Sequence, residues 1–220
     1  MSISKVYEVL ELKVFFKTFL ALFVIVDPVG GLPLFLSLTQ DYSVKERRLT
    51  ALKASLAAFF VLSGFTFLGE KILLFFQISL GSFRVAGGAL LFLIALEMLQ
   101  AKPRSTKSTP SEEAESRERE DISLVPLAVP ILAGPGAITT VIVMAGGESL
   151  SLKLTILSAC ALTFMATFVL FSQADRIARV LGRTGANLLV RIMGLLLAVI
   201  AVEYMVEGLK EVFPVLRGTT

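Results

Sequence analysis

Histidine is absent from this chain of 220 residues, and cysteine occurs once, as Cys160. Without histidine there is no serine–histidine pair for nucleophilic catalysis, and a zinc site lacks its usual nitrogen ligand. One cysteine cannot form an internal disulfide. Only one aspartate lies in an apolar block, so a catalytic pair of aspartates inside a membrane is also missing. We therefore expect no metal site, no cofactor and no enzymatic activity, and we expect Cys160 to be a small buried residue.

Charged residues are also sparse, at 18% of the chain, while 55% of the residues are hydrophobic and the mean hydropathy is +0.80. A soluble domain is about 45–50% apolar. The apolar residues form long blocks, and a helix that spans a bilayer needs about 20 of them in succession. The sequence therefore predicts an all-α membrane protein with six transmembrane helices, near residues 14–39, 49–69, 84–100, 122–146, 152–172 and 187–209. The first dozen residues do not have the pattern of a signal peptide.

Basic residues concentrate in three loops, 40–48, 101–121 and 173–186, which fall on one side of six spans. Such a bias marks the cytoplasmic side of a membrane. We therefore expect a multi-pass protein of the cell inner (plasma) membrane with both termini extracytoplasmic. Because the basic residues lie in these loops, we expect no nucleic-acid binding. The 101–121 loop is rich in Ser, Thr, Pro and charge, which predicts a flexible linker between domains 1–100 and 122–220.

The second half of the chain repeats features of the first half at an offset of 107 residues. At this offset Pro135 falls on Pro28, Arg191 falls on Arg84 and Gly194 falls on Gly87. Each unit has an odd number of spans, so the second copy must enter the membrane from the opposite face. The sequence thus predicts two inverted three-helix repeats, an architecture of secondary transporters that bind substrate near the midplane.

The first and fourth spans contain clusters of proline and glycine, which weaken or break helices. A straight helix over 14–39 would be about 39 Å long, against a hydrocarbon core of about 30 Å. We expect both helices to be discontinuous, and the alternative is a kink without function. The breaking residues are Pro28, Gly30, Gly31 and Pro33 in the first span, and Pro126, Pro130, Gly134, Pro135 and Gly136 in the fourth.

An interrupted helix offers N–H groups that attract a carboxylate and C=O groups that attract an ammonium group. Two broken helices could therefore hold both ends of a zwitterion. Gly136 and Ala137 would let a ligand approach the backbone, and Thr139 and Thr140 add hydroxyl groups. Asp27 is a carboxylate in an apolar block and predicts an ion or substrate path. The alternative for Asp27 is an N-cap of the second half-helix.

Charged residues inside the third and sixth spans predict two gating ion pairs. From the lengths of the helices, Arg84 would meet Glu203 near the outer face, and Glu97 would meet Arg191 near the inner face. The alternative is that these long side chains reach the lipid headgroups. The small residues Gly87, Gly88 and Gly194 predict close helix crossings.

Four stretches resemble the MarC/SnatA family of bacterial and archaeal membrane proteins: DPVGGLPLFLSLT, PLAVPILAGPGAITTVIV, RVAGGALLFLIALEML and RIMGLLLAVIAVEYMVEGL. The resemblance implies an inner-membrane protein, related to LysE-type exporters, that transports small neutral amino acids with coupling to the proton gradient. It also implies a substrate site with the following lining: Asp27, Pro28, Gly30, Gly31, Pro33, Gly134, Pro135, Gly136, Ala137, Thr139 and Thr140.

We therefore expect a secondary transporter of glycine, alanine and serine that works by alternating access in the lipid bilayer. Its partners would be a small zwitterionic amino acid and protons, with Na+ as the alternative coupling ion. Since histidine is absent, a carboxylate or a chain of water would have to carry a coupling proton. The alternative function is a channel or exporter for other small polar solutes, because a fold does not fix its substrate.

Overall fold

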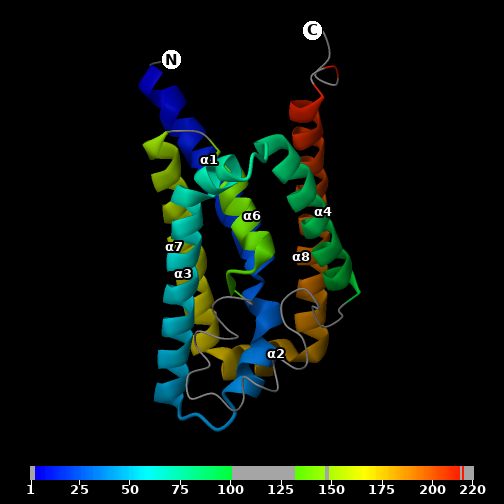
Figure 1. Cartoon of the computed structure of the whole chain (residues 1–220). Coiled ribbons are helices and arrows are strands. Elements are labelled where there is room, and N and C mark those ends of the chain that lie inside the picture. Colours follow the sequence, from blue (N-terminus) through cyan, green and yellow to red (C-terminus); the bar gives the residue numbers. More distant parts are fainter. Residues whose placement is uncertain (1–2, 101–131, 147–148, 214, 216–220) are drawn as a thin grey trace.

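The computed structural model describes residues 3–100, 132–146, 149–213 and 215, and these residues form helices and no strand. The helices make one bundle (Figure 1). Their bounds are α1 (Ile3–Val26), α2 (Pro28–Leu38), α3 (Val44–Phe75), α4 (Leu80–Leu99), α6 (Pro135–Met144), α7 (Leu150–Ser172) and α8 (Ala174–Val212). The predicted linker 101–121 lies outside the described residues.

Five stretches of the described residues are long and apolar enough to cross a membrane. They are Glu11–Leu38, which joins α1 to α2, and the helices α3, α4, α7 and α8. The shorter α6 is also apolar, and the first part of the predicted span 122–146 lies outside the described residues. The prediction of an all-α membrane protein is confirmed.

Two helices extend well beyond the apolar blocks from which they were predicted. A capping box starts α3 at Val44, because the Glu46 N–H donates to Ser43 Oγ (3.3 Å) and the Ser43 N–H donates to Glu46 Oε2 (2.8 Å). The long α8 contains a kink at Gly182, whose φ of 60° and ψ of −178° are not helical. The apolar blocks therefore predict only the part of each helix that matches the membrane. The capping box sets where α3 begins, and Gly182 interrupts α8.

Close antiparallel packing joins α4 to α8. A Cβ added to Gly88 would lie 2.8 Å from the carbonyl oxygen of Ala201, and a Cβ added to Gly194 would lie 2.7 Å from Met98 Cβ. A Cβ added to Gly208 would lie 2.6 Å from the carbonyl oxygen of Gly81. Because only hydrogen atoms fit at these positions, the two backbones approach closely, and the predicted close crossings are confirmed.

The bundle has two ends that differ in their connections (Figure 1). We call the end where α1 begins and α8 ends the terminal face, and the opposite end the loop face. At the loop face Arg47 of α3 contacts two other helices, since its Nη1 donates to Asp175 Oδ2 of α8 (2.5 Å) and its Nη2 donates to the carbonyl oxygen of Thr39, the C-cap of α2 (2.9 Å). This contact ties the start of α3 to the start of α8.

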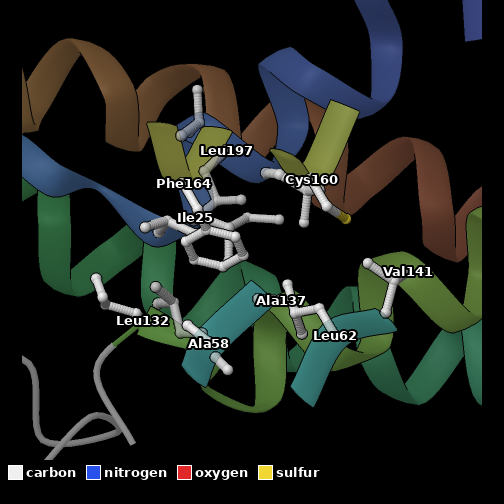
Figure 2. Close-up of a cluster of buried hydrophobic side chains, with 14 of the residues drawn as sticks. Ile25, Ala58, Leu62, Leu132, Ala137, Val141, Cys160, Phe164 and Leu197 are labelled. Atoms are coloured by element: carbon white, nitrogen blue, oxygen red, sulfur yellow. The ribbon is translucent and has the colours of Figure 1, made fainter. Parts of the chain in front are cut away.

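Between the two faces the core is apolar and draws on most of the helices. Figure 2 shows nine labelled side chains of this core, which come from α1, α3, α6, α7, α8 and the segment before α6. They are Ile25, Ala58, Leu62, Leu132, Ala137, Val141, Cys160, Phe164 and Leu197. Cys160 is fully buried and is a free thiol, as predicted from the apolar block around it.

Candidate functional site

A single residue, Asp27, separates α1 from α2. Asp27 has φ 44° and ψ 67°, in the left-handed region, and α2 starts at the next residue, Pro28. Proline has no N–H, so it cannot donate the helical hydrogen bond to the carbonyl of Val24. Helical bonding resumes at once, because the Gly31 N–H donates to the Asp27 carbonyl oxygen (3.1 Å). The irregular backbone is therefore confined to one residue.

The carboxylate of Asp27 is buried, with 3% of the residue exposed, and caps α2. Its Oδ1 accepts a hydrogen bond from the Gly30 N–H (3.1 Å). A Cβ added to Gly30 would collide with the carboxylate itself, so position 30 has no room for a side chain. The N-cap alternative for Asp27 is thus confirmed, and its role with a substrate or ion stays a prediction.

The helix α6 starts at Pro135 in the second half of the chain. Gly134 is extended (φ −63°, ψ 173°) and caps the helix with backbone alone. Its carbonyl oxygen accepts from the N–H groups of Ala137 (2.9 Å) and Ile138 (3.1 Å). Thr140 Oγ1 donates to the Gly136 carbonyl oxygen (2.9 Å). The first turn of α6 is therefore almost free of side chains on its buried side.

The start of α6 lies against the end of α1. A Cβ added to Gly136 would lie 3.2 Å from Ile25 Cγ2 and 2.9 Å from Leu91 Cδ2. Ile25 precedes Asp27 by two residues, so the two irregular segments meet although they are more than 100 residues apart in sequence. The carbonyl end of one helix and the N–H end of another are brought together inside the bundle.

The remaining predicted site residues divide between two environments. Gly31 of α2 faces Phe171 of α7, and an added Cβ would lie 3.3 Å from Phe171 Cζ. Gly134, Ala137, Thr139 and Thr140 are buried, like Pro28, whereas Pro33 and Pro135 are exposed. The α6 residues therefore lie beside α1 and α4, and the α2 residues lie beside α7 and α8.

The first predicted gating pair, Arg84 with Glu203, does not form in this structure. Arg84 pairs with Glu211, while Glu203 pairs with Lys17 of α1 at 3.4 Å. The pairing of Glu97 with Arg191 stays a prediction. The prediction used helix lengths, but the glycine contacts between α4 and α8 set another register. Glu203 lies eight residues from Glu211, which is roughly 12 Å along the helix.

Sequence reasoning gave no pairing role to five charged residues that form ion pairs in the structure: Lys17, Arg47, Asp175, Glu207 and Glu211. Lys17 contacts Glu203 at 3.4 Å and Glu207 at 3.8 Å, and Arg47 pairs with Asp175. Lys17 and Glu207 both fall inside predicted apolar spans, which was sufficient signal to select them. Arg47 lies in a basic loop and had no such signal. Among the described residues, no group of His, Cys, Asp and Glu could hold a metal ion.

Comparison with known proteins identifies related sequences over almost the whole chain. The profile described as "MarC family integral membrane protein" matches residues 12–213. A UPF0056 membrane protein of Aquifex aeolicus is 44% identical over 198 residues, covering 90% of this chain and 92% of its own length. The UPF0056 membrane protein YhcE of Escherichia coli is 42% identical over 205 residues, covering 93% and 95%. The UPF0056 membrane protein YvbG of Bacillus subtilis is 40% identical over 202 residues, covering 91% and 96%.

No solved structure matches this chain. The names of these relatives describe membrane proteins and give no substrate. An activity therefore has to be inferred from the residues where the two irregular segments meet.

Proposed function

Because the chain belongs to the MarC family of integral membrane proteins, we propose that it is a secondary transporter of small neutral amino acids. Glycine, alanine and serine are the substrates that we propose. The observation that supports this function is the contact of the end of α1 with the start of α6, at Ile25 and Gly136.

The two helix ends at this contact have opposite polarity. The C-terminal end of a helix is partially negative and its N-terminal end is partially positive. The end of α1 would therefore attract the ammonium group of an amino acid, and the start of α6 would attract its carboxylate. The capped carboxylate of Asp27 adds a negative charge beside the ammonium position. A zwitterion complements this arrangement, whereas a singly charged ion would match only one end.

The surroundings of α6 favour a substrate with a very small side chain. Leu91, Ile25 and Ile94 all lie within 3.2 Å of the position that a Cβ on Gly136 would take. Close packing of this kind makes added atoms costly. A substrate that approaches the first turn of α6 can therefore carry only a very small side chain, such as the hydrogen, methyl or hydroxymethyl group of glycine, alanine or serine.

We propose an inverted repeat as the basis of alternating access. Helices α2 and α6 begin at Pro28 and Pro135, which are separated by the same 107-residue offset that relates the two halves of the sequence. The connections after α3 and within α8 each contain a residue with positive φ, at Gln77 (57°) and Gly182 (60°). In transporters with inverted repeats, one unit rocks against the other around a fixed site.

The distribution of basic residues supports a cytoplasmic loop face. Arg47 and Arg48 lie near the start of α3 at this face, and Arg176, Arg179 and Arg183 lie on the first part of α8. Both ends of the chain would then be extracytoplasmic. Asp27 is the buried acid of the described residues and the candidate to couple transport to a proton, with Na+ as the alternative ion.

Uptake of labelled glycine into proteoliposomes tests this function. We expect saturable uptake, counterflow when unlabelled glycine is loaded inside, and faster uptake with an imposed proton gradient. Unlabelled alanine and serine should compete, and leucine and phenylalanine should not. Linear flux without counterflow would indicate a channel, and an absence of flux for all small amino acids would contradict the proposal.

A further inference from the structure

Two buried hydroxyl groups in the terminal half of the bundle have no hydrogen-bond partner within the described residues. They belong to Thr18 of α1 and Tyr204 of α8, which are 0% and 1% exposed. Other buried threonines, such as Thr163, donate to the carbonyl four residues earlier. A buried hydroxyl group without a partner is costly, and such groups usually bind water or a ligand.

The two hydroxyl groups lie at the same level as an ion pair. Thr18 follows Lys17 in α1, and Tyr204 follows Glu203 in α8, while Lys17 Nζ lies 3.4 Å from Glu203 Oε1. Lys17 also lies 3.8 Å from Glu207 Oε1. Since the charged residues are exposed and their neighbours are buried, the hydroxyl groups lie on the inner side of the charges. We call Lys17, Glu203 and Glu207 the Lys17 triad.

The Lys17 triad lies inside the apolar part of the helices. Lys17 is six residues into the span Glu11–Leu38, or roughly 9 Å. Glu203 lies nine residues before the end of α8, or roughly 14 Å. The side chains of Lys17 and Glu203 are nevertheless 47% and 52% exposed. Exposure of charges to lipid at such depth is unfavourable, whereas exposure to a water-filled passage is not.

Polar side chains lie between the Lys17 triad and the proposed substrate site. Tyr204 of α8 lies near Thr140 of α6 and near the carboxylates of Glu203 and Glu207. The geometry of the Tyr204 hydroxyl group is not that of a hydrogen bond to Thr140. Thr140 in turn donates to the carbonyl of Gly136, which lies beside Ile25. These residues lie along the line where α1, α6 and α8 meet, which we call the seam.

We propose that this seam is the terminal-face half of the substrate route and that the Lys17 triad closes its outer end as a gate. The inference rests on the proposed transport function. With the gate closed, Lys17 pairs with both carboxylates and offsets one of their two negative charges. When Lys17 moves away, Glu203 and Glu207 face the passage and attract the ammonium group of an incoming amino acid. The hydroxyl groups of Thr18, Tyr204 and Thr140 then replace part of its hydration shell.

Thiol labelling tests the passage without reference to transport. The protein is placed in lipid nanodiscs, so that both faces are accessible, and treated with a charged methanethiosulfonate reagent. The unmodified chain provides the blank, because its one cysteine, Cys160, is buried. Glu203→Cys should react about tenfold faster than Val202→Cys, since a thiol needs water to ionise and react. Val202 is the matched control, because it lies on the same turn, is apolar and is 45% exposed. Equal rates at both positions would overturn the passage.

The gate has its own labelling experiment. Tyr204→Cys places a thiol just inside the Lys17 triad, and Lys17→Met removes the cation that holds the triad together. We expect Lys17→Met to accelerate labelling of Tyr204→Cys by about fivefold, as expected from the loss of an exposed ion pair. Labelling of Val202→Cys should not change. If Lys17→Met leaves the Tyr204→Cys rate unaltered, the triad is not a gate.

Transport by Tyr204→Phe completes the test. The substitution removes only the hydroxyl group, so it should lower glycine uptake about two- to tenfold, the effect of one hydrogen bond. It should leave Tm unchanged or raise it, because the hydroxyl group has no partner to lose. Unchanged uptake would show that the hydroxyl group of Tyr204 does not contribute to the substrate route. If glycine is not a substrate at all, labelling at 203 and 204 still decides whether the passage exists.

Discussion

The methyl group of Thr139 in α6 occupies the space that a side chain at Gly87 of α4 would need. A Cβ added to Gly87 would collide with Thr139 Cγ2. Thr139 is buried in the same turn as Thr140, so this contact fixes the first half of α6 against α4. The helix whose start forms the proposed site is thereby held by a glycine on the neighbouring helix.

Gly87→Ala should destabilise the protein by about 1–3 kcal/mol, because it overpacks this contact. Thr139→Ser removes the colliding methyl group and should restore most of the lost stability in the double variant. Thermal unfolding with a thiol-reactive dye measures both effects, since buried Cys160 becomes reactive only on unfolding. Additive losses in the double variant would contradict the contact.

Gly136→Ala should reduce transport more than stability. Its Cβ would lie 2.9 Å from Leu91 Cδ2 and 3.2 Å from Ile25 Cγ2, at the ends of flexible side chains that can shift. The added methyl would therefore occupy the substrate position while the fold adapts at a cost of about 1 kcal/mol. Initial rates of glycine uptake and Tm separate the two effects.

Gly64→Ala is the matched control for this experiment. Gly64 lies inside α3, and an added Cβ would meet nothing within 4 Å. Alanine is about 1 kcal/mol better than glycine inside a helix. The control should therefore have an equal or higher Tm and normal uptake, and a loss of uptake in both variants would remove the argument for Gly136.

Asp27→Asn should abolish uptake driven by the proton gradient and leave Tm nearly unchanged. Asparagine keeps the oxygen that accepts from the Gly30 N–H and tolerates the left-handed φ of 44°. The substitution therefore removes the charge and keeps the cap. Uptake with and without an imposed gradient is the measurement, and full gradient dependence in the variant would exclude Asp27 as the coupling group.

Asp27→Ala separates the cap from the charge. Alanine removes the capping oxygen, at about 0.5–2 kcal/mol, and is strained at positive φ by about 1–2 kcal/mol. We expect a clearly lower Tm than in Asp27→Asn. Equal Tm values for the two variants would show that the hydrogen bond to Gly30 does not stabilise α2.

Charge reversal tests the register of α4 against α8. Arg84→Glu should lower stability by about 1 kcal/mol, because it replaces a half-buried ion pair with two like charges. Adding Glu211→Arg should restore Tm, and adding Glu203→Arg should not. Rescue by Glu203→Arg instead would support the pairing that was predicted from helix lengths.

Much of the fold could be predicted from local chemistry. The apolar blocks predicted the helices, and α2 and α6 begin at prolines, which favour the first position of a helix. Gly88 and Gly194 predicted close helix crossings, because a glycine inside a span can be identified without knowing which helix packs against it. The partner of Arg84 could not be predicted in this way. It depends on the axial shift between α4 and α8, and a shift of two turns exchanges one glutamate for another.

The sequence by itself determined that this is an α-helical membrane protein, where its chain can leave the helical conformation, and which end of the bundle is rich in arginine. These properties follow from the composition and conformational preferences of short segments. Only the tertiary structure decided that Ile25 lies against Gly136, that Lys17 pairs with Glu203 and that the hydroxyl group of Tyr204 is buried without a partner. Contacts between distant helices depend on how whole helices pack, and packing is the sum of many small contacts that no single segment contains.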